Sequence, residues 1–356
     1  MVTLENYTRR IAKLDEASMV EARRIQDALT KPKGSLGKLE TLSVQLAGIY
    51  RTPSPTMGRK VVFTMAADHG VTAEGVSAYP SEVTAQMVLN FARGGAAINV
   101  LARHAGAEVK VVDIGVASDM RWPECVLDRK IMKGSRNMAV GPAMSREEAT
   151  EAVLAGAELA TESIAAGTSA LAIGDMGIGN TTAASAITSV ITGTPVRDVT
   201  GRGTGIDDKT LDAKVRAIEK AIFHNRPDHA DGLDVLSKVG GLEIAGLVGV
   251  ILGGAARGVP VFLDGFVSGS AALVAAVICP ESKGYMIASH LSVEPGHRYV
   301  MEHLGFVPLL DMGMRLGEGT GAVLAFQIAE AACKIINEMA TFENANVSRS
   351  IKEVRK

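Results

Sequence analysis

Two acidic residues each stand among glycines just before a stretch that can form a helix. Asp175 belongs to GDMGIGNTT, and Glu318 lies between Gly317 and Gly319 in RLGEGTGA. Glycine opens the backbone to close approach by a ligand, and a carboxylate near a helix N-terminus is stabilised as the anion. We therefore expect Glu318 to be ionised at neutral pH and to suit a general base. The alternative is a charge at a helix end with no chemical role.

The stretch MGIGNTT has the composition of an anion-binding turn. Gly177 and Gly179 let backbone N–H groups approach a ligand, and the following helix directs its positive end there. Side-chain donors are added by Asn180, Thr181 and Thr182, and either threonine could cap the helix. The stretch lacks the Gly-Lys-Ser/Thr of a Walker A loop. It predicts a phosphate site, with an ordinary strand–helix turn as the alternative.

A second glycine cluster, GRGTG, precedes an amphipathic stretch in which Asp207 or Asp208 can cap a helix. Lys214 lies at the edge of the apolar stripe of this helix. Its ammonium group can either extend to solvent or reach inward as a point charge on a phosphate. Both outcomes are compatible with the pattern.

The segment MAADHGVTAEGVSAYPSEVT follows the first apolar run and predicts a long loop at the carboxyl end of a strand. Such a loop is expected to form a pocket wall. The helix after it carries Gln86 and Met87, which could line a flat apolar ligand. Asp68 and His69 lack a second histidine or cysteine at ligand spacing, so we expect no metal site. No GxSxG elbow or Cys/His signature indicates a covalent nucleophile.

The composition excludes several classes of function. The chain has 356 residues, a net charge of −2 and only 4% aromatic residues, which argues against nucleic acid as a partner. Its three cysteines are scattered, as in a reduced compartment. The N-terminal residues lack the apolar core of a signal peptide, and glycines, Arg257 and Pro260 interrupt the most apolar run, 244–263. We expect a cytoplasmic enzyme or binding protein without a membrane span.

Short apolar runs alternate with longer helical patterns. Candidate strands are 61–67, 109–115, 169–175, 260–266, 285–289 and 307–313, and candidate helices are 82–104, 145–166, 181–192, 208–224, 268–279 and 320–340. This alternation predicts an α/β fold with a doubly wound, mostly parallel sheet flanked by helices. Ligands are then expected at the carboxyl ends of the strands. Residues 1–55 with 335–356 predict a smaller helical domain, and 56–334 the large α/β domain.

With these segments in view, the chain resembles the nicotinate-nucleotide–dimethylbenzimidazole phosphoribosyltransferase family, which activates the lower-ligand base of cobalamin. The resemblance extends from KPKGSLGKLE to RLGEGTGA. It includes DHGVTAEGVSAYPSEVTAQMV, FARGGAAINVLA, RNMAVGPAMS, MGIGNTT, GRGTG, VGGLEIAGL and LDGF, all in family order. This set of motifs is far more specific than any one of them.

The resemblance implies a reaction, its substrates and its residues. Phosphoribose moves from nicotinate mononucleotide to an aromatic base, with inversion at the anomeric carbon and without a cofactor. It assigns the general base to Glu318 and a supporting carboxylate to Asp175. The nucleotide's phosphate and ribose would be held by Gly177, Gly179, Asn180, Thr181, Thr182, Gly203, Gly205, Lys214 and Gly317. The base pocket would contain Tyr79, Pro80, Gln86, Met87, Ser292 and Leu316.

Two departures from the family pattern bear on the acceptor. Asp175 stands where the family usually has glutamate, and Ser81 stands where glutamine often precedes the glutamate of the pocket loop. Relatives that use phenol or p-cresol work as pairs of unlike subunits, so a phenol-type transferase subunit is the first alternative to a homodimeric enzyme. A non-catalytic nucleotide-binding subunit is the second. A dinucleotide oxidoreductase does not fit, because the fingerprint glycines do not follow the first strand.

Overall fold

The computed structural model describes residues 3–203 and 205–348. Its sheet contains β1 (Arg59–Ala67), β2 (Ala107–Gly115), β3 (Val126–Asp128), β4 (Thr168–Met176), β5 (Val261–Leu263) and β6 (Met286–Ala288). These strands lie in the order β3-β2-β1-β4-β5-β6, and every pair is parallel. The order reverses between β1 and β4, which creates the crevice where doubly wound folds bind ligands. The predicted fold class is confirmed.

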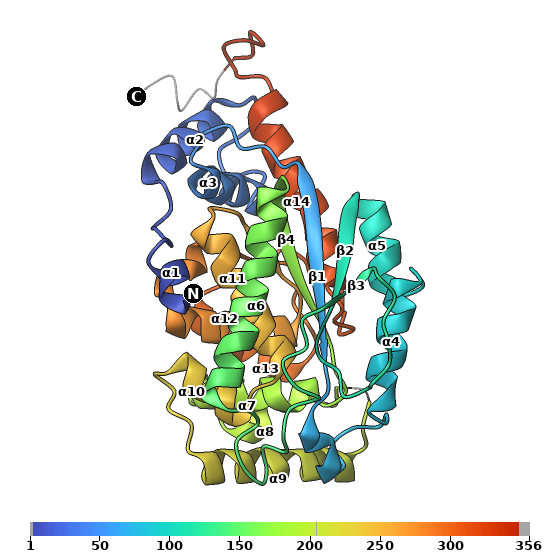
Figure 1. Cartoon of the computed structure of the whole chain (residues 1–356). Helices are drawn as coiled ribbons and strands as arrows, with labels where there is room; N and C mark the ends of the chain where they lie inside the picture. Colours follow the sequence, from blue (N-terminus) through green and yellow to red (C-terminus); the bar gives the residue numbers. More distant parts are fainter. Residues whose placement is uncertain (1–2, 204, 349–356) are drawn as a thin grey trace.

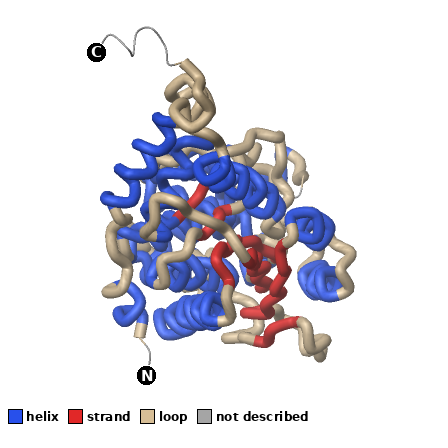
Figure 2. Tube along the Cα trace, turned by 90° about the horizontal axis from the view of Figure 1, so that it is seen from above, coloured by secondary structure: helices blue, strands red, loops and turns tan. Residues whose placement is uncertain are grey.

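Helices cover both faces of this sheet (Figures 1 and 2). One layer contains α6 (Arg146–Ala165), α11 (Leu242–Ala256) and α12 (Phe266–Ile278), and the other contains α4 (Glu82–Ala92), α5 (Ala97–Ala105) and α14 (Thr320–Glu338). At the carboxyl end of the sheet lie η1 (Gly70–Glu74), α7 (Asn180–Thr192), α8 (Val196–Val199), α9 (Asp208–Asn225), α10 (Gly232–Val239) and α13 (Pro295–Leu304). The remaining helical segments are α1 (Leu4–Thr8), α2 (Glu16–Ala28), α3 (Lys38–Tyr50) and η2 (Pro280–Tyr285).

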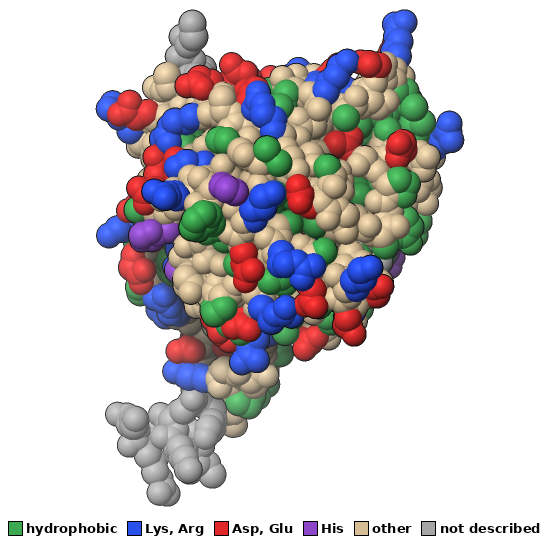
Figure 3. Space-filling model, turned by 90° about the horizontal axis from the view of Figure 1, so that it is seen from below, with side chains coloured by type: hydrophobic (Ala, Val, Ile, Leu, Met, Phe, Trp, Pro, Cys, Tyr) green, Lys and Arg blue, Asp and Glu red, His purple; other side chains and the backbone are tan. Residues whose placement is uncertain are grey.

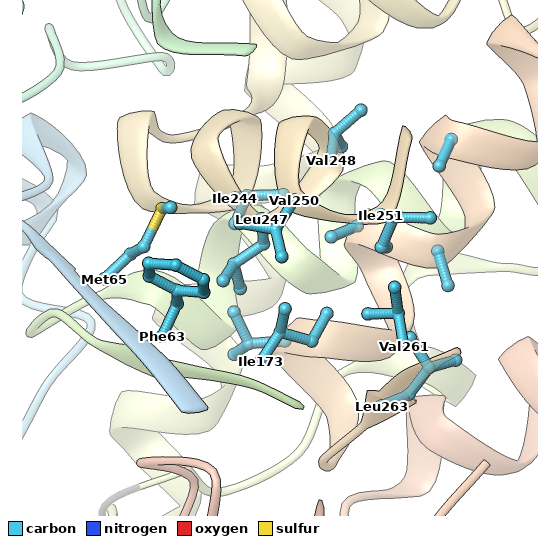
Figure 4. Close-up of a cluster of buried hydrophobic side chains, with 14 of the residues drawn as sticks. Phe63, Met65, Ile173, Ile244, Leu247, Val248, Val250, Ile251, Val261 and Leu263 are labelled. Atoms are coloured by element: carbon cyan, nitrogen blue, oxygen red, sulfur yellow. The ribbon is translucent and has the colours of Figure 1, made fainter. Parts of the chain in front are cut away.

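The apolar run 244–263 forms a buried helix followed by a strand, as the sequence predicts. Side chains of α11 pack against the strands: Ile244 and Leu247 lie over Phe63 and Ile173, and Ile251 lies over Val261 of β5 (Figure 4). The glycines of this helix allow the backbone of α6 to approach closely, since a Cβ at position 249 would lie 1.9 Å from the Val153 carbonyl oxygen. In the part of the chain that the structure describes, no helix is long and apolar enough to cross a membrane.

Two predicted elements differ from the structure, and two observed elements were not predicted. The segment 307–313 is not a strand and makes only an isolated bridge between Leu310 and His290. The predicted helix 82–104 is two helices, because the chain turns at Gly94, where φ is +75°. The short strand β3 and the helix α13 were absent from the prediction, since neither carries a long apolar pattern.

The N-terminal helices pack against the end of α14 that lies away from the carboxyl edge of the sheet (Figure 1). A small apolar cluster of Ala22, Val44, Ala47 and Ile336 joins α2, α3 and α14. Residues of α3, such as Leu46 and Ile49, also belong to the main core. The division into a small helical domain and a large α/β domain stays a prediction.

Candidate active site

A cavity of about 450 Å³ lies at the carboxyl ends of the strands, at the point where the strand order reverses. Its volume suits a small organic ligand. Of the residues predicted from the sequence, those that line it are Tyr79, Met87, Asp175, Gly177, Gly179, Asn180, Thr181, Gly203, Lys214, Ser292, Leu316, Gly317 and Glu318. Two glycine-flanked segments that are far apart in the sequence thus converge on one space.

Glu318 is fixed in a backbone conformation that side chains other than glycine rarely adopt. Its φ is +66°, and its neighbours Gly317 and Gly319 have φ of +86° and +98°. The Glu318 N–H donates to the Asp175 carbonyl oxygen at 3.2 Å, and the Thr64 hydroxyl donates to the Glu318 carbonyl oxygen at 2.9 Å. These contacts with neighbouring strands hold the loop in its strained form.

Close packing at Gly174 makes this arrangement possible. A Cβ at position 174 would lie 2.2 Å from the main-chain carbon of Glu318. Only glycine therefore allows the loop of Glu318 to rest on the end of β4. The glycine preceding Asp175 in the sequence thus serves the packing between the two acidic segments.

The Glu318 carboxylate is buried, with 5% of the residue exposed, and its Oε2 accepts from the Ile98 N–H at 3.2 Å. Burial raises the pKa of Glu318, the hydrogen bond from Ile98 opposes that rise, and the charge of Asp264 adds to it. Burial thus outweighs the stabilisation of the anion expected at a helix N-terminus, and ionisation of Glu318 at neutral pH stays a prediction. A raised pKa makes the carboxylate a better proton acceptor once it is ionised.

Asp175 lies near the end of β4, where its carbonyl oxygen accepts from the Glu318 N–H. Its Oδ2 accepts from the Asn180 amide at 2.8 Å, and a Cβ at Gly317 would lie 3.2 Å from the same oxygen. Burial raises the pKa of Asp175 well above its usual value, and the charges of Asp264, Glu243 and Glu318 add to the rise. Mutual repulsion between carboxylates favours protonation of one of them.

Lys214 reaches inward from α9 and is 1% exposed, which decides between the two outcomes that the sequence left open. Its Nζ donates to the Thr181 hydroxyl at 2.8 Å and to the Gly201 carbonyl oxygen at 3.3 Å. Burial lowers the pKa of Lys214 to about 8, although the charge of Glu294 opposes the shift. This ammonium group therefore lies between the two glycine-rich turns, where its positive charge would stabilise a bound anion.

The turn at Gly203 is held by charged side chains from two other segments. The Gly203 N–H donates to Glu294 Oε1 at 3.0 Å, and Arg315 Nη1 donates to the Gly203 carbonyl oxygen at 2.8 Å. Arg202, Glu294 and Arg315 also line the cavity. Asp207 caps α9 by accepting from the Thr210 N–H at 2.8 Å, which confirms one of the two predicted caps.

An apolar wall comes from the loop after η1 and from α4. Val76, Tyr79, Val83 and Met87 line the cavity, and Leu316 joins them from the loop of Glu318. Tyr79 and Leu316 are 53% and 57% exposed. Large apolar side chains left open to solvent at a cavity are typical of a surface that a flat ligand covers.

Four predicted site residues lie outside the cavity lining. Pro80, Gln86 and Gly205 are exposed, and Thr182 is buried within α7. The predicted cap of α7 by a threonine was wrong: the helix begins at Asn180, and Gly179 is its N-cap with φ +96°.

Several further charged or polar residues of the site were not predicted from the sequence. Asp264 lies behind the cavity at the start of α14, and His290, Glu294 and Arg315 line it. Asp264 had a detectable signal, because LDGF places an acid and a glycine between a strand and a helix. The other three depend on tertiary contacts that spacing alone does not reveal.

Asp68 and His69 lie beneath the site instead of in it. His69 Nε2 is 2.7 Å from Glu243 Oε1, and a Cβ at Gly179 would lie 3.2 Å from His69 Cβ. Thr84 completes this layer, since its hydroxyl accepts from the Ile178 N–H at 3.1 Å. The layer therefore supports the 177–179 turn from below. Among residues 3–203 and 205–348, no group of three or more His, Cys, Asp or Glu is placed to hold a metal ion.

Fold and cavity together define an α/β protein with a cavity for a small ligand at the switch point of a parallel sheet. A family model described as "Phosphoribosyltransferase" matches residues 11–347. The chain belongs to the nicotinate-nucleotide–dimethylbenzimidazole phosphoribosyltransferase family.

Individual relatives are similar to this chain over nearly its full length. The chain is 57% identical to the nicotinate-nucleotide–dimethylbenzimidazole phosphoribosyltransferase of Roseiflexus sp. (strain RS-1), over 99% of each chain. It is also 57% identical to that of Chloroflexus aggregans, over 98% of this chain and 99% of the relative. A crystal structure of the Thermus thermophilus protein of the same name superimposes with a TM-score of 0.90, at 47% identity, covering 95% of this chain and 100% of that one.

Proposed function

We propose that this protein transfers the phosphoribosyl group of nicotinate mononucleotide to 5,6-dimethylbenzimidazole, giving α-ribazole phosphate and nicotinate. The observation that carries the proposal is the convergence of Glu318 with the glycine turns on one cavity, in a chain that is 57% identical to relatives named for this reaction.

The nucleotide would be held by its phosphate. The 177–179 turn, the start of α7 and the buried Lys214 provide N–H donors and one positive charge on the same side of the cavity. Such a site suits a dianion, because the helix N-terminus and the ammonium group both favour negative charge. The phosphate would then fix the position of the ribose between the turns and Glu318.

The chemistry requires one bond to form, one to break and one proton to move. The imidazole nitrogen that carries a lone pair attacks the anomeric carbon, and the bond from that carbon to the nicotinate nitrogen breaks. The electron pair of the broken bond neutralises the pyridinium nitrogen of the leaving group. Glu318 accepts the proton of the other imidazole nitrogen. Attack opposite the leaving group inverts the anomeric carbon.

Asp175 would act next to this proton transfer. It lies within the same cavity and shares a raised pKa with Glu318. An ionised carboxylate here would ease positive charge that develops on the ribose. Its side chain is one methylene shorter than the glutamate usual in the family, so we assign it a supporting role.

Assembly and location form part of the proposal. A homodimer is the proposed assembly, with a pair of unlike subunits as the alternative. A cytoplasmic location is supported by the free thiols of Cys125, Cys279 and Cys333. On the face seen in Figure 3, basic and acidic side chains are interspersed, which does not suit a nucleic acid backbone.

The test of this proposal replaces the general base, Glu318. Glu318→Gln should lower kcat by about 100-fold or more, because general base catalysis contributes that much, while the Kd of nicotinate mononucleotide stays nearly unchanged. Glu338→Gln, at the exposed far end of α14, is the matched control. Release of nicotinate by the purified chain is the assay. Native turnover by Glu318→Gln would remove the base assignment, and binding without release by the unaltered chain would support a non-catalytic subunit.

The acceptor is tested separately. We expect kcat/KM to be higher with 5,6-dimethylbenzimidazole than with phenol or p-cresol at a fixed nucleotide concentration. A preference for the phenols, or activity that requires a second unlike chain, would favour the heterodimeric transferase instead.

A further inference from the structure

Asp264 is a buried carboxylate directly after β5, and only 1% of it is exposed. Its Oδ2 accepts from the Gly319 N–H at 3.0 Å. Its Oδ1 accepts from the N–H groups of Gly321 and Ala322 at 2.7 and 3.3 Å. One side chain from the end of β5 thus satisfies three of the free donors at the start of α14.

These donors flank the general base. Gly319 follows Glu318 immediately, and three consecutive residues here have positive φ. Such a conformation persists only where several contacts determine it. The Thr64 hydroxyl fixes the carbonyl group of Glu318, and Asp264 fixes the next N–H along the chain. Without Asp264 the loop would lose its contact with the segment after β5.

His290 supports Asp264 from the other side. Its Nε2 is 3.5 Å from Asp264 Oδ1, and the residue is 2% exposed. The ring fits because position 321 is glycine: a Cβ there would lie 2.0 Å from His290 Cδ2. Two glycines, a histidine and an aspartate therefore form one close-packed unit behind Glu318.

We infer that Asp264 is a positioning residue that fixes the orientation of the Glu318 carboxylate toward the acceptor base. The inference rests on the proposed function, because it concerns the same proton transfer. Asp264 acts through the loop of Glu318, since it does not itself line the cavity.

Asp264 also affects the basicity of Glu318. Burial raises the pKa of Glu318, and the negative charge of Asp264 raises it further. The charge of Asp175 on β4 interacts with both carboxylates, and His290 after β6 contacts Asp264. Beyond these two groups, Glu243 on α11 interacts with Asp175, and His297 on α13 lies beside His290. Since Asp264 adds to the basicity of Glu318, its removal should show in the pH dependence of catalysis as well as in the rate.

The alternative is a helix cap that stabilises the fold alone. Asp231 offers the matched control, because its Oδ1 accepts from the N–H groups of Leu233 and Asp234, both at 3.1 Å, at the start of α10. It lines no part of the cavity. Asp231→Asn should lower the melting temperature and leave the kinetics unchanged.

The test compares Asp264→Asn with this control. Asn keeps the size of the side chain but removes its charge and presents an amide group to donors. We expect kcat to fall about 10- to 100-fold, as a misplacement near 1 Å produces, with the Kd of nicotinate mononucleotide within about 3-fold. We also expect the acid limb of the kcat profile to move to lower pH, because the pKa of Glu318 falls when the neighbouring charge is lost.

A second variant keeps the inference testable if Asp264→Asn does not fold. Asp264→Glu retains the charge but shifts it by one methylene, so kcat should fall while the acid limb stays in place. Native kcat in either folded variant would overturn the inference. If Glu318→Gln is inactive while Asp264→Asn is native, only the positioning role fails. If Glu318→Gln is native, the proposed base fails as well.

Discussion

Lys214 offers a quantitative test of the phosphate site. Burial lowers its pKa to about 8 in the free protein, partly offset by the charge of Glu294. A bound phosphate dianion would favour the charged ammonium form. Nucleotide binding should therefore weaken as the pH rises through about 8, because the free protein must then take up a proton on binding.

The magnitude follows from that pKa. About nine-tenths of the Lys214 side chains are protonated at pH 7 and about one-tenth at pH 9, so the Kd of nicotinate mononucleotide should rise about 10-fold between them. Calorimetric titration without acceptor base measures this directly, since it excludes the ionisation of Glu318 during turnover.

Two variants of α9 complete the test. Lys214→Met should bind weakly at every pH and remove the dependence. Lys220→Met, exposed on the same helix, should retain it. A Kd for the unaltered protein that stays constant to about pH 9.5, or the same loss in both variants, would refute the assignment of this lysine.

Further outcomes can be measured with single variants. Gly174→Ala should lower kcat by about 10-fold or more and the melting temperature with it, because its Cβ would lie 2.2 Å from the main chain of the general-base loop. Gly141→Ala, with nothing within 4 Å of the new carbon, is its control. His69→Gln should lower the free energy of unfolding by about 3–5 kcal/mol by breaking a buried ion pair, seen by denaturant titration. Burial opposes the charged form of His69, yet its carboxylate partner raises the pKa above 6.5, so this stability is complete below pH 6.5 and lost as the pH rises through the raised pKa. The unaltered protein should show that decline and His69→Gln should not. Tyr79→Ala should raise the KM for the aromatic base about 3- to 10-fold, as loss of an aromatic contact does, without changing nucleotide affinity. Native kinetics in both Gly174→Ala and Tyr79→Ala would contradict the assignment of this cavity.

Much of the site could be predicted because its signals are local. Asp175 and Glu318 each sit beside glycine and precede a helix, and ligands of a doubly wound fold bind at the carboxyl edge of the sheet where such turns gather. Asp264 has the same pattern, but the apolar run 260–266 predicts one continuous strand, whereas β5 ends at Leu263. An acidic residue becomes a candidate site residue only when the end of the preceding strand is predicted correctly.

Other features could not be read from spacing. Glu294 and Arg315 act on Gly203 across 91 and 112 positions, and nothing local marks those contacts. The segment 307–313 has the apolar composition of a strand, yet it makes one isolated bridge and joins no ladder of the sheet. The direction of the Glu318 pKa depends on how deeply the residue is buried, which only the packed structure determines.

Because α14 is long, the packing of α2 and α3 at its far end influences the position of Glu318 at its start. Its 19 residues form a rod of about 28 Å that starts beside Glu318 and ends against Ala22, Val44 and Ala47. A tilt of about 2° at the far end would displace the near end by about 1 Å, which is enough to slow a reaction that depends on alignment. The small side chains of that remote cluster therefore set the tilt of α14 and, through it, the position of Glu318. Enlarging one of them should lower kcat at a size that still leaves the protein folded.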